Sequence, residues 1–428
     1  MINKLKPKSE FSKNVLTLMT GTTIAQVIPI AISPILTRLY TPEDFGVLAL
    51  FVAITSIFGS IANGRYELAI MLPKKDEDAI NIFALGFIIV SVLSLFLLFV
   101  VIIFHDYILD LLNNKEISPW LYFVPVSVFF MGLFNILNYF NNRKKQYKDL
   151  AKATIIKSIV TAIVQFSLGF FKAGVTGLIS GQLASSFFAN MKLLKNILDD
   201  KKLVLKINKL KMLALAKRYK DFPKFTLWAG LLNTSSTHLT NILISSLFSI
   251  KTLGFYSLSQ RLLAMPSSLI GGSIGQVLFQ QATEEKHKTG YIDKSFKSVL
   301  KKLVLISLPS FFILFFIVED LFAFVFGEEW RIAGYYAKIL IPLFAISFIV
   351  SPLTILNQVN LKNKLGMQWQ IGLLSLYMII LYISDIVDLS FVKTLYSIVI
   401  IISSYYLFFL YLIYNHARKR NEKIFQNK

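Results

Sequence analysis

The chain has 428 residues, of which 55% are hydrophobic and 16% charged, and its formal net charge at pH 7 is +21. A soluble protein of this size carries about 25% charged residues, so the composition excludes an ordinary soluble domain. The absence of Cys and the presence of only 4 His exclude disulfides and thiol chemistry, and we expect neither a metal site nor a cofactor. So basic a soluble chain would suggest nucleic acid. Here the positive charge lies between long apolar runs, and we expect no nucleic-acid partner.

Twelve apolar runs each approach the roughly 20 residues that cross a bilayer as a helix. The sequence therefore predicts an all-α polytopic membrane protein with about 12 transmembrane helices. A basic segment, Lys4 to Lys13, leads into the first run without a small-residue cleavage pattern, so no cleavable signal peptide is expected. The runs are 14–36, 46–68, 80–104, 119–140, 153–171, 174–194, 225–247, 253–281, 299–318, 336–356, 367–384 and 393–415.

The fifth and sixth runs are nearly continuous, and only Gly169, Lys172 and Gly174 mark a turn between them. We divide them because a helix of about 40 residues would be about 60 Å long, twice the thickness of the hydrocarbon layer.

The distribution of Lys and Arg assigns a side of the membrane to each loop. Most of the 45 lie in the two tails and every second loop, in runs such as Arg143-Lys144-Lys145 and Lys301-Lys302. Positive charge favours the cytoplasmic side, so both termini are predicted to be cytoplasmic. The opposite set holds only Arg38, Lys115, Lys172, Lys251, Arg331, Lys338 and Lys393.

The segment 195–224 is the longest interruption, and it is rich in Lys. Apolar residues at helical spacing predict an amphipathic cytoplasmic helix lying at an anionic leaflet; they are Leu203, Ile207, Leu210, Leu213 and Ala214. The segment separates a predicted N-terminal six-helix bundle, 1–194, from a C-terminal one, 225–428, with a basic tail.

A weak internal repeat supports this division. The segment Tyr40–Val47 follows the first run, and Phe248–Phe255 follows the seventh at an offset of 208 residues. With six spans in each half, both halves enter the membrane from the same side, as in transporters built from parallel repeats.

Several short motifs carry a family resemblance. They are GTTIAQ at 21–26, TRLYTPEDFG at 37–46, RYELAIMLP at 65–73, LGFYSL at 253–258 and FGEEWRIAG at 326–334. In their order and spacing the chain resembles the polysaccharide-transporter branch of the multidrug/oligosaccharidyl-lipid/polysaccharide exporter superfamily, and most of all the O-antigen and capsule repeat-unit flippases.

The resemblance implies two six-helix bundles around a central cavity in the bacterial inner membrane. It also implies translocation of an undecaprenyl-diphosphate-linked oligosaccharide to the outer face, which we expect to occur by alternating access. A proton or sodium counter-ion, a polymerase and glycosyltransferase complex as partners, and action as a monomer are further expectations.

Ionisable residues inside spans are costly and usually face a cavity or a partner. Arg261 lies about nine residues into the eighth run, beside Gln260. Arg can bind phosphate oxygens in a bidentate manner, so Arg261 is the leading candidate for contact with the diphosphate or an acidic sugar. The alternative is a structural arginine bonded to helix carbonyls or to a carboxylate.

Other candidate cations lie nearer the span ends. Arg65 and Glu67 are at the inner end of the second run; two residues apart on a helix they would not share a face, so we expect only Arg65 to reach the cavity mouth. Arg38 is either a substrate contact or part of a local salt bridge. Lys157 either receives the diphosphate or extends to the cytoplasmic surface.

The seventh run is unusually polar. Five of its polar residues follow helical spacing and could form a wall that binds sugar hydroxyls, or they could join helices. They are Asn233, Thr237 and Asn241, with Ser236 and Thr240. Gln26 is a weaker candidate of the same kind. His238 and Glu67 are candidates for ion coupling.

No Walker motif, nucleophile elbow or metal-ligand spacing is present, so we expect a transporter and not an enzyme. One alternative is an exporter of another lipid-linked glycan or of drugs, although a drug/cation antiporter should carry acidic residues deep in its first bundle. Another is a glycan polymerase or ligase, which would usually need a large outer loop. A structural scaffold is a third alternative.

Overall fold

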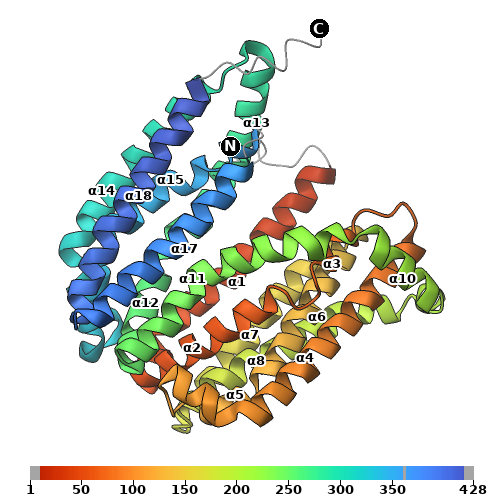
Figure 1. The fold of residues 1–428 in the computed structure, drawn as a ribbon, viewed down its shortest axis with the longest axis horizontal. Helices are drawn as coiled ribbons and strands as arrows, with labels where there is room; N and C mark the ends of the chain where they lie inside the picture. The colour runs from red at the N-terminus through yellow and green to blue at the C-terminus, as the bar shows by residue number, and fades with distance from the viewer. Residues whose placement is uncertain (1–9, 360–362, 419–428) are drawn as a thin grey trace. The chain divides into compact units, whose positions relative to one another are not determined.

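A computed structural model describes residues 10–359 and 363–418, and within those ranges it contains helices and no β-strand (Figure 1). This confirms the predicted all-α fold. The chain divides into two compact units, Met1–Ser246 (unit 1) and Leu247–Lys428 (unit 2). The polar helix predicted to open the second bundle is therefore grouped with the first unit by its contacts. The start of the basic segment at Lys4 and the tail beyond Arg418 lie outside the described residues.

Unit 1 is built around α6, α7 and α8, with α7 packed on α8 and α1, and α6 packed on α4, α8 and α2. Its α-helices are α1 (Glu10–Leu39), α2 (Pro42–Gly59), α3 (Tyr66–Ala69), α4 (Asp76–Leu112), α5 (Ser118–Leu121), α6 (Val124–Arg143), α7 (Tyr147–Phe170), α8 (Val175–Leu198), α9 (Lys201–Val204), α10 (Lys209–Arg218) and α11 (Leu227–Leu247). A π-helical turn, Phe222–Thr226, leads into α11.

Unit 2 is organised around α15, which packs on α12, α14 and α18, and α17 packs on α18. Its α-helices are α12 (Ile250–Pro266), α13 (Gly272–Thr289), α14 (Asp293–Phe326), α15 (Arg331–Leu353), α16 (Leu356–Val359), α17 (Asn363–Ile386) and α18 (Phe391–Arg418). A π-helical segment, Ser267–Gly271, joins α12 to α13, and a 3-10 turn, Glu328–Trp330, precedes α15.

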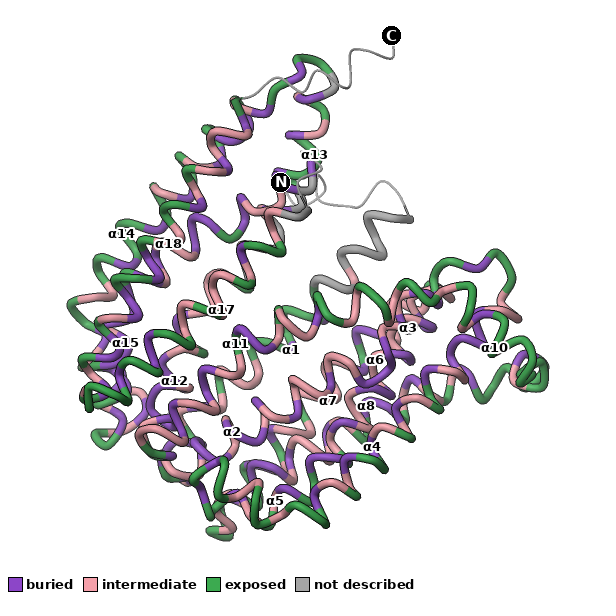
Figure 2. Tube along the Cα trace, in the orientation of Figure 1, coloured by how far each residue is buried: buried purple, intermediate pink, exposed green. Residues whose placement is uncertain are grey.

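Nine helices within the described residues are long and apolar enough to cross a membrane. They overlap nine of the twelve predicted runs, with bounds that differ most at the second run, where α2 ends at Gly59. The other three runs coincide with α8, the polar α11 and the α12–α13 pair, which a π-helical segment interrupts. Along α4, large apolar side chains such as Leu95, Phe96 and Phe99 are exposed, as lipid-facing residues are (Figure 2).

The turn that divides the fifth and sixth runs lies where the sequence predicts it. The backbone takes positive φ angles at Lys172 (56°) and Gly174 (55°), which ends α7 and starts α8.

The basic segment 195–224 differs from the single amphipathic helix predicted for it. It forms two short helices, α9 and α10, because the Asn208 side chain caps α10 at Leu210 N and Asn208 N donates to Asn81 Oδ1 of α4 at 2.7 Å. Leu203 is buried, whereas Leu210 and Leu213 stay exposed. Contact with a membrane surface stays a prediction.

The internal repeat is also present in the local structure. Thr41 caps α2 by accepting from Asp44 N, and Ser249, 208 residues later, caps α12 by accepting from Thr252 N. Each cap follows a buried or half-buried aromatic residue, Tyr40 or Phe248, that comes directly after the preceding helix.

Tyr40 fixes one end of unit 1. Its ring lies in a slot left by two glycines: a Cβ added at Gly169 would lie 2.7 Å from the ring, and one at Gly177 would meet the hydroxyl. The hydroxyl donates to Gln165 O of α7 at 2.6 Å. Burial, together with the charge of Asp44, raises the pKa of Tyr40 to about 12, so this donor keeps its proton.

Candidate functional site

The turn after α2 forms a buried polar cluster that the sequence predicts only in part. The second run was expected to stay helical to residue 68, but α2 ends at Gly59. Gly64 and Arg65 then both adopt left-handed backbone conformations, with φ of 60° and 62°. The Asn63 side chain holds this turn to α4 by donating to Gly86 O at 3.1 Å.

This geometry overturns the expectation that Arg65 and Glu67 point in different directions. Because Arg65 lies outside the helix, its Nη1 is 3.5 Å from Glu67 Oε1 and the two side chains form an ion pair. Glu67 is 4% exposed. Burial raises the pKa of the Glu67 carboxyl, and hydrogen bonding to its own backbone and the positive charge of Arg65 offset only part of that rise.

The Arg65 guanidinium lies directly against the backbone of α11 at Gly230. A Cβ added at Gly230 would lie 2.5 Å from Arg65 Cζ and 2.6 Å from Nε, and closer still to Nη2. Only glycine leaves room for the guanidinium at this position. The cluster therefore joins the turn after α2 to the polar helix of unit 1.

The polar residues of α11 do not form the single wall drawn from the sequence. Asn233 and Thr237 are exposed on one side, whereas Asn241, together with Ser236 and Thr240, is buried. The exposed pair is accessible to a ligand, whereas the buried side chains are enclosed by the protein. Sugar binding by this helix and the alternative, the joining of helices, both stay predictions.

His238, Lys157 and the candidates of α1 lie in separate environments. His238 Nδ1 is buried without a hydrogen-bond partner among the described residues. Lys157 Nζ lies 5.3 Å from the centre of the Phe134 ring of α6, at cation–π distance. Gln26 and Arg38 are exposed, and Arg38 donates to Pro34 O at 2.7 Å.

In unit 2, Arg261 lies on the exposed side of α12. The buried side of that helix is held to α15 by Ser259, whose hydroxyl donates to Ala333 O at 2.6 Å. Gln260 Nε2 is 3.5 Å from Tyr256 Oη. Within the described residues Arg261 has no hydrogen bond and no ion pair, so neither structural alternative considered for it, a carbonyl or a carboxylate partner, is present there.

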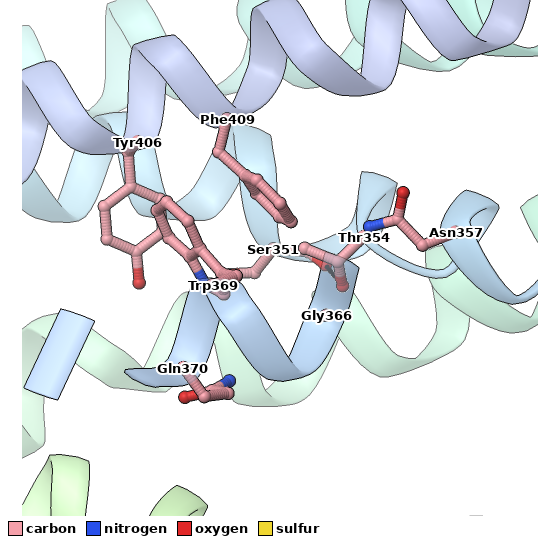
Figure 3. A pocket seen from close by; sticks show the side chains of 8 residues that line it. All are labelled: Ser351, Thr354, Asn357, Gly366, Trp369, Gln370, Tyr406 and Phe409. Atoms are coloured by element: carbon pink, nitrogen blue, oxygen red, sulfur yellow. Dashed lines mark hydrogen bonds between the residues drawn. The ribbon is translucent and has the colours of Figure 1, made fainter. Parts of the chain in front are cut away.

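Unit 2 also contains a cavity of about 430 Å³ that no predicted residue lines (Figure 3). Its walls come from the end of α15, the turn into α16, and helices α16, α17 and α18. The described lining residues carry hydroxyl, amide and aromatic groups and no charged side chain; they are Ser351, Thr354, Asn357, Gly366, Trp369, Gln370, Tyr406 and Phe409. Trp369 is stacked on Phe409 at 4.1 Å. Such a cavity can take water or a neutral polar group.

The described residues contain no group of three or more His, Cys, Asp or Glu side chains that could hold a metal ion. Among the candidates described above, unit 1 has cations, amides and the buried Glu67 carboxylate, and unit 2 has Arg261 and Gln260. In each unit by itself, this chemistry suits binding of an anion and hydrogen bonding to neutral polar groups.

Comparison with known proteins gives the family. Residues 35–334 match the family model described as "Polysaccharide biosynthesis protein". The chain belongs to this family. The predicted resemblance to polysaccharide transporters is thereby confirmed at the level of the family. No curated protein matches the chain.

Solved structures of transporters share its fold. The lipid II flippase MurJ, in an inward closed conformation, aligns with a TM-score of 0.71 and 14% identity over 92% of this chain and 87% of its own. An inward-facing multidrug resistance MATE family transporter of the MOP superfamily gives 0.64 and 12% over 94% and 93%. A MOP superfamily transporter from Pyrococcus furiosus gives 0.55 and 12% over 95% of both chains. At these identities the likeness establishes the fold.

Proposed function

We propose that this protein is a flippase that moves undecaprenyl-diphosphate-linked oligosaccharide repeat units from the cytoplasmic to the outer face of the bacterial inner membrane. The product would serve O-antigen, capsule or exopolysaccharide assembly. Transport proceeds by alternating access, and the protein is a transporter and not an enzyme. The observation that carries the proposal is Arg261, an exposed cation within a predicted span that has no partner among the described residues.

The chemistry of the cargo explains why such an arginine is needed. A diphosphate loses strong hydration when it leaves water, and a guanidinium can replace that hydration with two parallel charge-assisted hydrogen bonds. A cation held inside a span is costly unless it acts on a substrate or ion pathway. Arg261 therefore favours an anionic cargo over a cationic drug.

The family supplies the glycan part of the proposal, because its members are described as polysaccharide biosynthesis proteins. The fold supplies transport, since the lipid II flippase MurJ has it. The Pyrococcus furiosus transporter is described as having a binding pocket of reversed polarity that suggests a different function. Pocket polarity therefore varies within this fold, as a change from drugs to anionic lipids requires.

Several finer points belong to the same proposal. Both termini are cytoplasmic, as the charge alternation indicates. Asn233 and Thr237 contact the sugars, and Arg65, Lys157, Arg38, Gln260, Asn241 and Gln26 are the remaining substrate-contact candidates. A proton or sodium ion couples transport through Glu67 or His238, and the monomer works beside a polymerase and glycosyltransferases.

The test replaces Arg261 by Gln and by Lys in cells whose surface polysaccharide depends on this protein. Loss of charge-assisted hydrogen bonds worth about 1.5–3 kcal/mol should reduce transport roughly 10- to 100-fold in Arg261→Gln, with partial retention in Arg261→Lys. The matched control is Arg331→Gln, because Arg331 is paired with Asp320 at 2.6 Å. Normal surface polysaccharide in Arg261→Gln at wild-type protein levels would overturn the proposal.

A further inference from the structure

The cluster after α2 contains more unused hydrogen-bonding capacity than a structural ion pair needs. Three buried side-chain atoms have no hydrogen-bond partner among the described residues: Asn63 Oδ1, Arg65 Nε and Glu67 Oε2. Buried polar atoms are nearly always satisfied, and leaving one unsatisfied is costly. Three such atoms within five residues indicate a site whose partner is a ligand.

The ion pair itself is loose. Arg65 has five N–H donors, yet its contact with Glu67 is 3.5 Å long, whereas charge-assisted hydrogen bonds are about 2.7–2.9 Å. The guanidinium is held in place by the left-handed backbone at Arg65 and by the opening at Gly230. Residues held in rare backbone conformations cluster at ligand-binding and switch regions.

We propose that Arg65 and Glu67 form a proton-linked anion site. Without ligand, the Glu67 carboxylate is paired with the Arg65 guanidinium. When a diphosphate binds, its oxygens accept hydrogen bonds from the guanidinium in place of Glu67. Glu67 then accepts one proton from water, so a neutral carboxyl group remains in the buried site. This inference rests on the proposed function, because the diphosphate of the lipid-linked glycan is the anion.

The reason for the linkage is electrostatic. A carboxylate and a phosphate close to one guanidinium repel each other, and burial already disfavours the charged carboxylate. Within the described residues, the charged and titratable groups that act on Glu67 are Arg65 on its own turn and Tyr139 of α6. No second cation acts on Glu67 there, so the anion and the Glu67 charge compete for Arg65.

Proton linkage makes a specific statement about binding. Anion affinity rises as the pH falls, because the proton removes the competing carboxylate. Coupling between two sites is reciprocal, so the anion also raises the proton affinity of Glu67.

The experiment is isothermal titration calorimetry of the full-length protein in detergent, with farnesyl diphosphate as the probe and inorganic pyrophosphate as the lipid-free comparison. Titrations in buffers of different ionisation enthalpy give the number of protons taken up for each anion bound. Wild type should take up more protons than Glu67→Gln. At high pH, where Glu67 is charged, the variant should bind about tenfold more tightly than wild type, a size within the range for coupled sites, and the two affinities should converge as the pH falls.

The free probe also exchanges protons with the buffer, but it does so equally in the titrations of wild type and Glu67→Gln. The difference in proton uptake between the two proteins therefore isolates Glu67. Glu77→Gln is the matched control, because it removes the same charge from a carboxylate of unit 1 that pairs with Lys206 and Lys211. Its proton uptake should equal that of wild type. Proton uptake that depends on Glu67, observed with both probes or with farnesyl diphosphate alone, supports the site.

Equal proton uptake in wild type and Glu67→Gln would overturn the proposal. Unchanged affinity in Arg65→Gln would overturn it as well. These outcomes are separate from a failure of the proposed function, which is tested by transport in Arg261→Gln and does not depend on binding at Arg65.

Discussion

Replacing Gly230 with Ala puts a methyl group where the Arg65 guanidinium now lies. The new Cβ would be 2.5 Å from Arg65 Cζ, whereas non-bonded carbon atoms prefer about 3.5–4.0 Å. The end of a flexible side chain moves more readily than a helix backbone, so the guanidinium withdraws by roughly 1–2 Å. We expect this movement to lengthen its ion pair with Glu67.

The size of the effect follows from Coulomb's law. At an effective dielectric constant of about 20, opposite charges about 3.5 Å apart attract by about 5 kcal/mol, and a further 1.5 Å or so removes about 1.4 kcal/mol. The pKa of Glu67, already raised by burial, should therefore rise further in Gly230→Ala, because the lost attraction stabilised the charged carboxylate.

The assay is pH-difference infrared spectroscopy, which detects the C=O stretch of a protonated carboxyl group. The band that is absent from Glu67→Gln belongs to Glu67, and its pH midpoint is compared between wild type and Gly230→Ala. Ala229→Ser is the control, because residue 229 is exposed and next in the chain. A midpoint in Gly230→Ala that is unchanged or lower would refute the claim that the guanidinium at Gly230 sets the charge of Glu67.

Three further predictions concern stability and topology. Gly177→Ala should lower the free energy of unfolding in detergent by about 1–3 kcal/mol, because its Cβ meets the Tyr40 hydroxyl. The control Gly366→Ala, with open space around it, should not lower it. Equal melting temperatures of Gly177→Ala and wild type would contradict the close packing of Tyr40. The raised pKa of Glu67 means that its contribution to stability is fully present below the ordinary pKa of 4.5 and is lost as the pH rises through the raised pKa. The melting temperature of wild type should therefore fall relative to that of Glu67→Gln over that pH range. A constant difference between the two melting temperatures would count against burial of the carboxyl. Because the chain has no Cys, Lys209→Cys should react only with a membrane-permeant thiol reagent in intact cells; labelling by an impermeant one would reverse the topology.

The sequence predicts most of the fold because apolar length and charge alternation are properties of each segment by itself. Each of the twelve predicted runs overlaps a helix, although the second run extends past the end of α2 at Gly59. Two glycines and one charge predict the turn at Lys172. The linker 195–224 was harder, because the Asn208–Asn81 contact that divides it into two helices joins residues 127 positions apart.

The candidate site could be predicted less well. The sequence singles out Arg65 and Glu67 as ionisable residues near a span, but their pairing depends on a left-handed backbone at Arg65, a conformation that non-glycine residues rarely adopt. The cavity near Asn357 was missed because residues of α17 and α18 close it. The spacing of Ser351, Thr354 and Asn357 at every third position was the available signal.

The slot that holds Tyr40 has a consequence for movement. The Tyr40 side chain, directly after α1, lies between Gly169 of α7 and Gly177 of α8 and donates a hydrogen bond to the α7 backbone. This one residue therefore connects three helices. These helices cannot separate at that end without pulling the ring out of a close-packed slot. We therefore expect any opening of unit 1 to pivot about this end, with larger displacements where the chain turns after α2.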